Sequence, residues 1–167
     1  MKSPRDPASP QRSWGNRLGR NPVLIVALVL IATIVTFQWP MLKGMYYGVS
    51  SPAPDDGIGW RTDLAAALAE AQQAHKPVLV DVSASWCPPC RVMKHEVWPD
   101  DKVRAAVLAH FIPVLIDPDL PINREVLERY GVRGFPTVLM LDTSGAAVKE
   151  ANFLTRDQML RFLGAQG

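Results

Sequence analysis

The chain has 167 residues, of which 48% are hydrophobic and 20% are charged. This length is typical of one globular domain with an additional segment, and the apolar fraction is sufficient for a core. The formal net charge is only +2, and basic residues are concentrated in a proline- and serine-containing stretch before residue 23 (Lys2, Arg5, Arg12, Arg17 and Arg20). Because these charges lie on a tail rather than on a folded face, no nucleic-acid partner is expected.

An uncharged apolar run follows the basic tail, from Val23 to Phe37. A helix of this length covers about 22 Å, and extension to Leu42 brings it near the roughly 30 Å of a bilayer core. Aromatic residues suited to the membrane interface lie near its end (Trp39, Tyr46 and Tyr47). A buried core helix should have a polar stripe, which this run lacks, and Val49-Ser50-Ser51 is a poor signal-peptidase site. We therefore predict an uncleaved transmembrane signal anchor over residues 23–42, with residues 1–22 in the cytoplasm.

A short linker and a folded domain should follow the anchor. The stretch "SSPAPDDG" is polar and rich in proline, which is typical of a linker, here assigned to residues 43–58. The folded domain is then expected over residues 59–167.

Helical and strand periodicities alternate within this domain. Helices are predicted over residues 63–75 with Thr62 as N-cap, from Pro88 with a break near Pro99 and a resumption at 101–109, over 123–130, and over 156–163. Strands are predicted over residues 78–84, 111–117, 137–142 and 146–151, of which the first two should be buried and the last two joined by a turn. Thr155 and Gln158 should form a capping box at the last helix. This order predicts an α/β fold, a mixed central sheet with helices on both faces.

The two cysteines of the chain, Cys87 and Cys90, follow the first predicted strand. Pro88 is suited to the first turn of a helix, so Cys87 should lie at a helix N-terminus. There the helix dipole and free N–H groups stabilise a thiolate, and can lower a thiol pKa from about 8.5 to roughly 3.5–7.5. A disulfide between them would close a small ring and would add little stability as a staple. Two roles therefore remain for the cysteines: metal binding or a redox-active pair.

For metal binding, the sequence does not supply a full set of zinc ligands. A structural zinc site needs four ligands, and the sequence has no second Cys pair or His pair to supply them. His95 should point away from Cys90, whereas Met93 lies closer to its face and would suit Cu(I) with the two thiolates. A copper-handling or scaffold module is kept as the alternative of another class; His75 and His110 are expected to have no chemical role.

The stretches "VDVSASWCPPC" and "GVRGFPT" resemble the thioredoxin superfamily, over about Trp60 to Gly164. The stretches "CRVMKHEVWPDDKV" and "ERYGVRGFPTVLMLDTSG" are most similar to the C-terminal periplasmic domain of DsbD-type thiol:disulfide interchange proteins. The resemblance implies the thioredoxin-like fold, a redox-active disulfide and no cofactor or metal.

The resemblance also implies roles for individual residues. Cys87 would be the exposed nucleophile, and Cys90 the shielded thiol that resolves the mixed disulfide. Asp81 would be the buried acid that takes the proton of Cys90, unless it faces solvent at the strand end. Pro136 would be the family's cis-proline and would line the substrate groove with Phe135, unless it is a trans proline opening an edge strand. Trp86 would flank the site, unless it only packs.

The function implied is a membrane-anchored thiol:disulfide oxidoreductase, expected to reduce disulfides of periplasmic proteins. A thiol oxidase or isomerase of the same fold is the alternative, because the Pro88-Pro89 dipeptide leaves the direction of electron flow open. The strand over residues 111–117 also lacks the lysine that thioredoxins often place opposite the buried acid. Expected partners are periplasmic thiol proteins, cytochrome c apoproteins or a DsbD-like electron donor. The expected location is a bacterial inner membrane, crossed once, with the C-terminal domain in the periplasm.

Overall fold

The computed structural model describes residues 22–50 and 52–164, and the chain divides between Gln38 and Trp39 into two compact units. The basic tail expected over residues 1–22 lies outside the described residues, except for Pro22. The first unit, in its described part, is the beginning of a long helix, α1, which runs Pro22–Ser50.

Helix α1 has the length and composition of a membrane span. Residues 22–48 qualify, with a mean hydropathy of 2.3 in the most apolar window and none of that window buried. Pro40 lies inside the helix and does not end it. The helix therefore continues past Leu42 to Ser50, into the segment that the sequence assigns to a linker.

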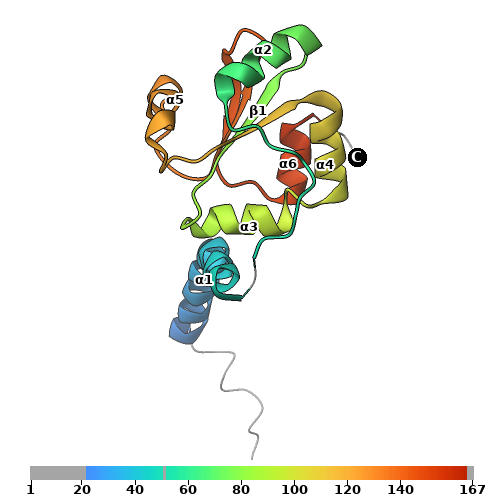
Figure 1. The fold of residues 1–167 in the computed structure, drawn as a ribbon. Helices are drawn as coiled ribbons and strands as arrows, with labels where there is room; N and C mark the ends of the chain where they lie inside the picture. The colour runs from blue at the N-terminus through green and yellow to red at the C-terminus, as the bar shows by residue number, and fades with distance from the viewer. Residues whose placement is uncertain (1–21, 51, 165–167) are drawn as a thin grey trace, which may run out of the picture. The chain divides into compact units, whose positions relative to one another are not determined.

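The second unit contains a four-stranded mixed sheet in the order β2-β1-β3-β4 (Figure 1). The strands are β1 (Val78–Val82), β2 (Ile112–Ile116), β3 (Thr137–Leu141) and β4 (Ala147–Ala151). β1 pairs in parallel with β2, whereas β3 pairs antiparallel with both β1 and β4. The predicted mixed sheet is confirmed, with each strand shorter than its predicted range by one or two residues.

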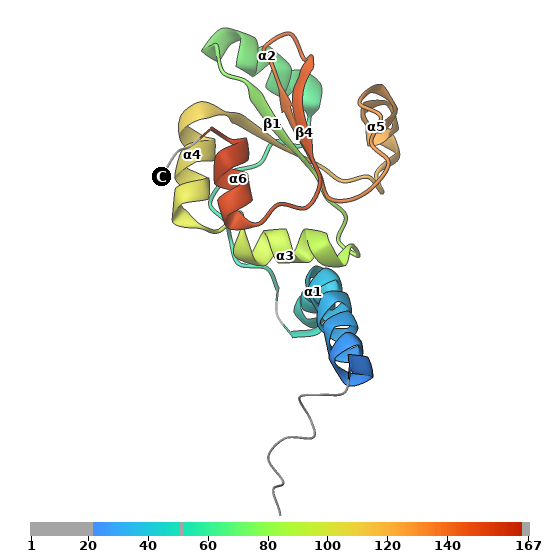
Figure 2. The same cartoon turned by 180° about the vertical axis from the view of Figure 1, so that it is seen from behind.

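Helices cover both faces of the sheet, as the alternation of elements predicts. They are α2 (Leu64–Ala74), α3 (Pro88–Glu96), α4 (Asp101–His110), α5 (Arg124–Arg129) and α6 (Arg156–Phe162), with a 3₁₀ turn at Pro121–Asn123. One hydrophobic cluster joins α3, α4 and α6 to Leu79 of β1, and a second joins α2 and α5 to Val78 and Val80. Figures 1 and 2 show α4 and α6 side by side. Since side chains alternate along a strand, Asp81 must point to the same face as Leu79.

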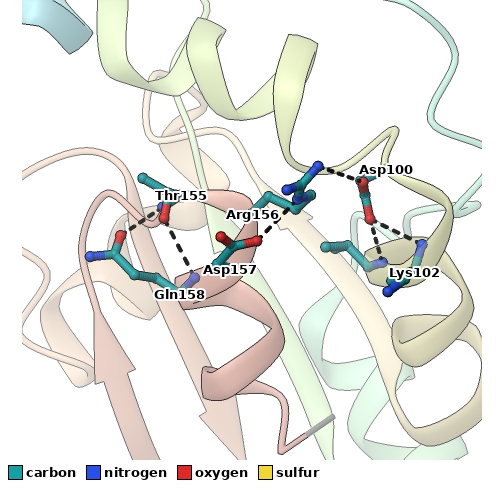
Figure 3. A network of polar contacts seen from close by, with 7 residues as sticks. Asp100, Lys102, Thr155, Arg156, Asp157 and Gln158 are labelled. Atoms are coloured by element: carbon teal, nitrogen blue, oxygen red, sulfur yellow. Dashed lines mark hydrogen bonds and ion pairs between the residues drawn. The ribbon is translucent and has the colours of Figure 1, made fainter. Parts of the chain in front are cut away.

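The helix ends depend on single capping side chains. Asp63, rather than the predicted Thr62, caps α2 and accepts a hydrogen bond from the N–H of Ala66. At α6 the predicted capping box of Thr155 and Gln158 is present (Figure 3). Asp100 caps α4, and its carboxylate lies 3.8 Å from the guanidinium of Arg156 at the start of α6. The polar groups at these two helix starts therefore form one network.

Strand β4 closes one side of the sheet and is largely exposed. Four of its five residues are exposed, and Val148 retains 54% of its surface. Lys149 and Glu150 lie in the middle of the strand, and Lys149 Nζ donates to the carbonyl of Phe162. The sequence pattern predicts this strand as one member of a hairpin, and the hairpin with β3 is confirmed.

Candidate functional site

The two cysteines lie where β1 leads through a short loop into α3. Cys87 is the N-cap residue of α3 and Cys90 lies in its first turn, as the position of Pro88 predicts. They form a disulfide with a Cα–Cα distance of 5.3 Å. The N–H of Cys90 lies 3.3 Å from Cys87 Sγ and donates to it. A free N–H at a helix start favours negative charge on the sulfur, so the arrangement suits Cys87 to be the thiolate after reduction.

The expectation that Cys87 is the exposed cysteine is wrong for this disulfide form. Cys87 retains 3% of its surface and Cys90 retains 1%, so both sulfurs are nearly covered. Phe135 packs against the cluster that both cysteines form with Ala84. Gly44 of α1 lies directly against the backbone of Pro88, which leaves no room for a Cβ at that position.

The segment of α1 that belongs to the second unit contacts α3 through polar groups as well. Lys43 and Tyr47 both bond to the carboxylate of Glu96. The ring of Tyr47 stacks on His95 with centroids 4.2 Å apart. The expected linker therefore includes residues that pack on the helix carrying the cysteines, a contact that composition did not predict.

Asp81 lies on β1 and is buried, with 2% of its surface exposed. The alternative that it faces solvent at the strand end is therefore wrong. Burial raises its pKa to about 7, against the opposing effects of the Lys94 charge and of a hydrogen bond from Trp98. Its Oδ2 accepts from Trp98 Nε1 at 3.0 Å, while Oδ1 is without a hydrogen-bond partner in the described part of the chain. A carboxyl group that titrates near neutral pH is suited to exchange a proton with a thiol.

Trp86 and Phe135 lie together on the surface beside the disulfide. Their rings meet edge to face with centroids 5.9 Å apart. Trp86 is 56% exposed, and its Nε1 donates to the carboxylate of Asp119 at 2.8 Å. The peptide bond between Phe135 and Pro136 is cis, as the resemblance implies. The structure thus brings four of the named residues, Trp86, Cys87, Cys90 and Phe135, to one place.

Met93, the residue on which the copper alternative depends, is placed elsewhere. It is 1% exposed and belongs to the hydrophobic cluster of α3, α4 and α6, whereas the cysteines belong to a separate cluster. Its thioether is therefore used in core packing.

Sequence reasoning missed four residues that contact or act on this site. Trp98 donates to Asp81, Asp119 accepts from Trp86, and the charges of Lys94 and Asp56 act on Asp81. One feature of the sequence could have pointed to Trp98: it is a side chain with an N–H donor, placed at the predicted break between two helices near Pro99. No local pattern identifies Asp119, because it lies 33 positions from Trp86.

Comparison with known proteins gives one family and several relatives. A thioredoxin-like family model matches residues 59–143. The thiol:disulfide interchange protein DsbD 1 of Pseudomonas aeruginosa is 36% identical over 107 residues, which are 64% of this chain and 17% of that protein. DsbD of Yersinia pestis is 28% identical over 153 residues, 84% of this chain and 25% of that protein. The chain therefore spans a quarter or less of these two relatives.

Solved structures agree with the fold. The oxidised C-terminal domain of DsbD from Neisseria meningitidis superposes with a TM-score of 0.52 and 26% identity, covering 64% of this chain and 97% of that chain. A thioredoxin from Thermus thermophilus superposes with a TM-score of 0.56 and 29% identity, covering 62% of this chain and 82% of that chain. Both matches cover most of the other protein's chain.

Proposed function

Because this chain belongs to the thioredoxin-like family, we propose that it is a thiol:disulfide oxidoreductase that reduces disulfides of periplasmic proteins through Cys87 and Cys90. The observation that carries the proposal is the disulfide at the start of α3, with an N–H donor on Cys87 Sγ and the buried Asp81 on the preceding strand. The similarity to thiol:disulfide interchange proteins supports the same reaction.

The reaction proceeds in two exchanges. In the reduced protein the Cys87 thiolate attacks one sulfur of a partner's disulfide, a mixed disulfide forms, and the partner's other sulfur leaves as a thiolate. Cys90 then gives its proton to Asp81 and attacks Cys87 Sγ, which releases the partner's second thiolate. Two electrons pass to the partner, and the domain is left with the disulfide seen in the structure. Exchange between thiols needs no further cofactor, and a dithiol donor must reduce the pair again.

The surface beside the disulfide is proposed to bind the partner. Trp86 is exposed there and, with Phe135 edge to face against it, offers an aromatic surface next to the cis peptide bond before Pro136. Since both sulfurs are nearly covered, a partner has to displace part of this cover to reach Cys87 Sγ. Cytochrome c apoproteins are proposed as acceptors and a DsbD-like membrane protein as donor.

We also propose that α1 anchors the protein in a bacterial inner membrane, with the basic tail in the cytoplasm and the second unit in the periplasm. The length and hydropathy of residues 22–48 support this placement. The excess of basic residues before residue 23 supports the orientation, because such residues stay on the cytoplasmic side.

Replacement of Cys90 by serine tests the exchange. The Cys90→Ser protein should accumulate disulfide-linked partners through Cys87, because no resolving thiol remains to release them. The adducts are trapped by acid quenching and alkylation and detected on non-reducing gels, with Cys87→Ser as the matched control that should trap none. Equal adduct levels in both variants, or none in either, would contradict the proposal.

The direction of electron flow is tested by the reduction potential of the pair, measured by equilibration with glutathione or dithiothreitol. A reductase should have a value of about −270 mV, as thioredoxin has, whereas a value of about −120 mV is typical of the oxidant DsbA. The second result would replace the reductase by the oxidase of the same fold.

A further inference from the structure

The two oxygens of the Asp81 carboxyl group have different surroundings. Oδ2 lies 3.0 Å from the indole N–H of Trp98, which donates to it. Oδ1 is buried and has no hydrogen-bond partner within residues 22–50 and 52–164. A buried polar oxygen without a partner is unfavourable, so natural proteins keep few of them. The unpaired oxygen is therefore the one available to a proton.

Trp98 is fixed in place by packing on several sides. It retains 1% of its surface and is the largest of the fully buried side chains. Its own backbone N–H donates to the carbonyl of Met93 in α3. Trp60 meets its ring edge to face at 5.0 Å, and the indole of Trp60 is itself held by a hydrogen bond to Asp56. The indole N–H of Trp98 is thus aimed at Asp81 by the fold and has little freedom to turn away.

The charged groups that act on Asp81 come from two segments. Lys94 of α3 favours the ionised carboxylate, and Asp56, in the segment before α2, disfavours it. Trp98 differs from both because it touches the carboxylate through a hydrogen bond. A donor to the charged form of an acid stabilises that form relative to the protonated one. Trp98 therefore opposes the effect of burial on this group.

We propose that Trp98 is a positioning residue of the redox site, which holds Oδ2 of Asp81 and keeps enough of the carboxylate ionised for Oδ1 to accept the proton of Cys90. The inference rests on the proposed function, since it assigns Trp98 a part in the second exchange. In that step the Cys90 proton passes to Asp81, the Cys90 thiolate attacks Cys87 Sγ, and the partner's sulfur departs with the electron pair of the broken bond.

The test replaces Trp98 by phenylalanine in the full-length chain in detergent micelles. Reduced protein is mixed with one equivalent of a symmetric chromogenic aromatic disulfide, whose halves absorb visible light when released as thiolates. The first half is released by attack of Cys87, and the second by attack of Cys90. The rate of the second release is measured across pH, together with the carboxyl ¹³C resonance of Asp81 in the oxidised protein.

Loss of the donor should move the titration of Asp81 to higher pH. With a shift of about one pH unit, the second release slows about tenfold on the acidic side of the titration and is nearly unchanged on the alkaline side. Trp60→Phe is the matched control, because it alters the same aromatic pair but leaves the donor to Asp81 in place. Its midpoint should shift less than that of Trp98→Phe, because Trp60 bonds to Asp56, which acts on Asp81 only through its charge.

Two further variants separate hydrogen bonding from packing. Trp98→Leu also lacks the N–H donor but leaves a larger cavity than Trp98→Phe. If the N–H is what matters, Asp81 should titrate with the same midpoint in both variants. In an Asp81→Asn background, Trp98→Phe should no longer change the pH dependence. Equal slowing of Trp98→Phe and Trp60→Phe at every pH, with no shift of the Asp81 resonance, would overturn the proposal.

Failure of the proposed function gives a different result. If the unmodified protein releases no second thiolate or exchanges with no protein disulfide, the proposal that it is an oxidoreductase is wrong. The ¹³C titration still reports whether Trp98 acts on Asp81, because it requires no turnover.

Discussion

Asp81 links the chemistry of single residues to the stability of the fold. Burial raises its pKa from 3.8 to about 7, so the folded protein holds a proton there that the unfolded chain releases near pH 4. Since the folded-state pKa is the higher one, protonation of Asp81 contributes stability that is fully present below about pH 4. That contribution is lost as the pH rises through about 7.

Replacement of Asp81 by asparagine should therefore stabilise the oxidised protein at pH 8. The shift corresponds to an upper limit of about 4 kcal/mol of unfolding free energy, at about 1.4 kcal/mol for each pKa unit. Urea unfolding at pH 4 and pH 8 measures the effect, which should be small at pH 4, near the unfolded pKa, and large at pH 8.

Asp142→Asn is the control of opposite sign. Hydrogen bonds from Ser144 and from the N–H of Ala146 lower the pKa of Asp142, so its contribution is present above its unfolded pKa and lost as the pH falls. This variant should gain nothing at pH 8. An Asp81→Asn protein that is no more stable than the unmodified chain at pH 8 would contradict the account of Asp81.

The residues of the site differ in how far the sequence could predict them. The pair Cys87 and Cys90 could be placed at a helix start because Pro88 marks that start locally. The burial of Asp81 could not be predicted, because the pattern of β1 alone does not show what covers each face of the strand. All five residues of β1 are buried, since helices pack on both faces of the sheet. Trp98 lies 17 positions from Asp81, and only the tertiary fold joins them. The burial of Cys87 likewise depends on Phe135, which is distant in sequence.

At the scale of elements, most helix ends follow from local chemistry, and the remaining differences involve competing caps. Thr62 and Asp63 are both able to cap α2, and the sequence does not choose between them; the structure uses Asp63. The C-terminal end of α2 is unusual in a different way. His75 follows the helix with φ of 52°, in the left-handed region that glycine adopts without strain.

Replacement of His75 by glycine should stabilise the protein. The side chain is exposed, so little packing is lost, and relief of the left-handed conformation should add about 1 kcal/mol to the unfolding free energy. Chemical denaturation compared with the unmodified protein checks this result.

His110 provides the matched control because it is also an exposed histidine at the end of a helix, α4. Glycine there should destabilise the protein by about 0.5–1 kcal/mol, since it increases the freedom of the unfolded chain without relieving strain. Equal effects of the two substitutions would show that the φ of His75 stores no strain.

At the scale of the whole molecule, α1 is the element on which the proposed membrane anchoring depends. The sequence predicts its apolar run, but it does not predict that the helix passes Pro40 and ends at Ser50. The contacts of Lys43 and Tyr47 with Glu96 explain the difference, because they give the last turns of α1 a surface to pack on. Local composition alone favours a linker there.

Full-length protein should remain in the membrane pellet after alkaline carbonate extraction. Replacing Leu30 and Ile34 by arginine should release it, because each arginine near the middle of a span opposes insertion by about 2.5–3.5 kcal/mol. Immunoblotting of pellet and supernatant measures the distribution.

Val148→Arg adds a charge on exposed β4 and serves as the control for charge alone, so it should leave the protein in the pellet. Extraction of the unmodified chain by carbonate would contradict membrane anchoring.

The outer edge of β4 has a further consequence, for the solubility of the protein. An exposed strand at the end of a sheet offers unpaired backbone groups to a second chain, and this pairing is the first step of fibrous aggregation. Lys149 and Glu150 place charged side chains in the middle of that edge. A second copy that paired with the edge would have to take these charges out of water. At the high concentrations of an overexpressed protein, these two side chains should therefore protect colloidal solubility.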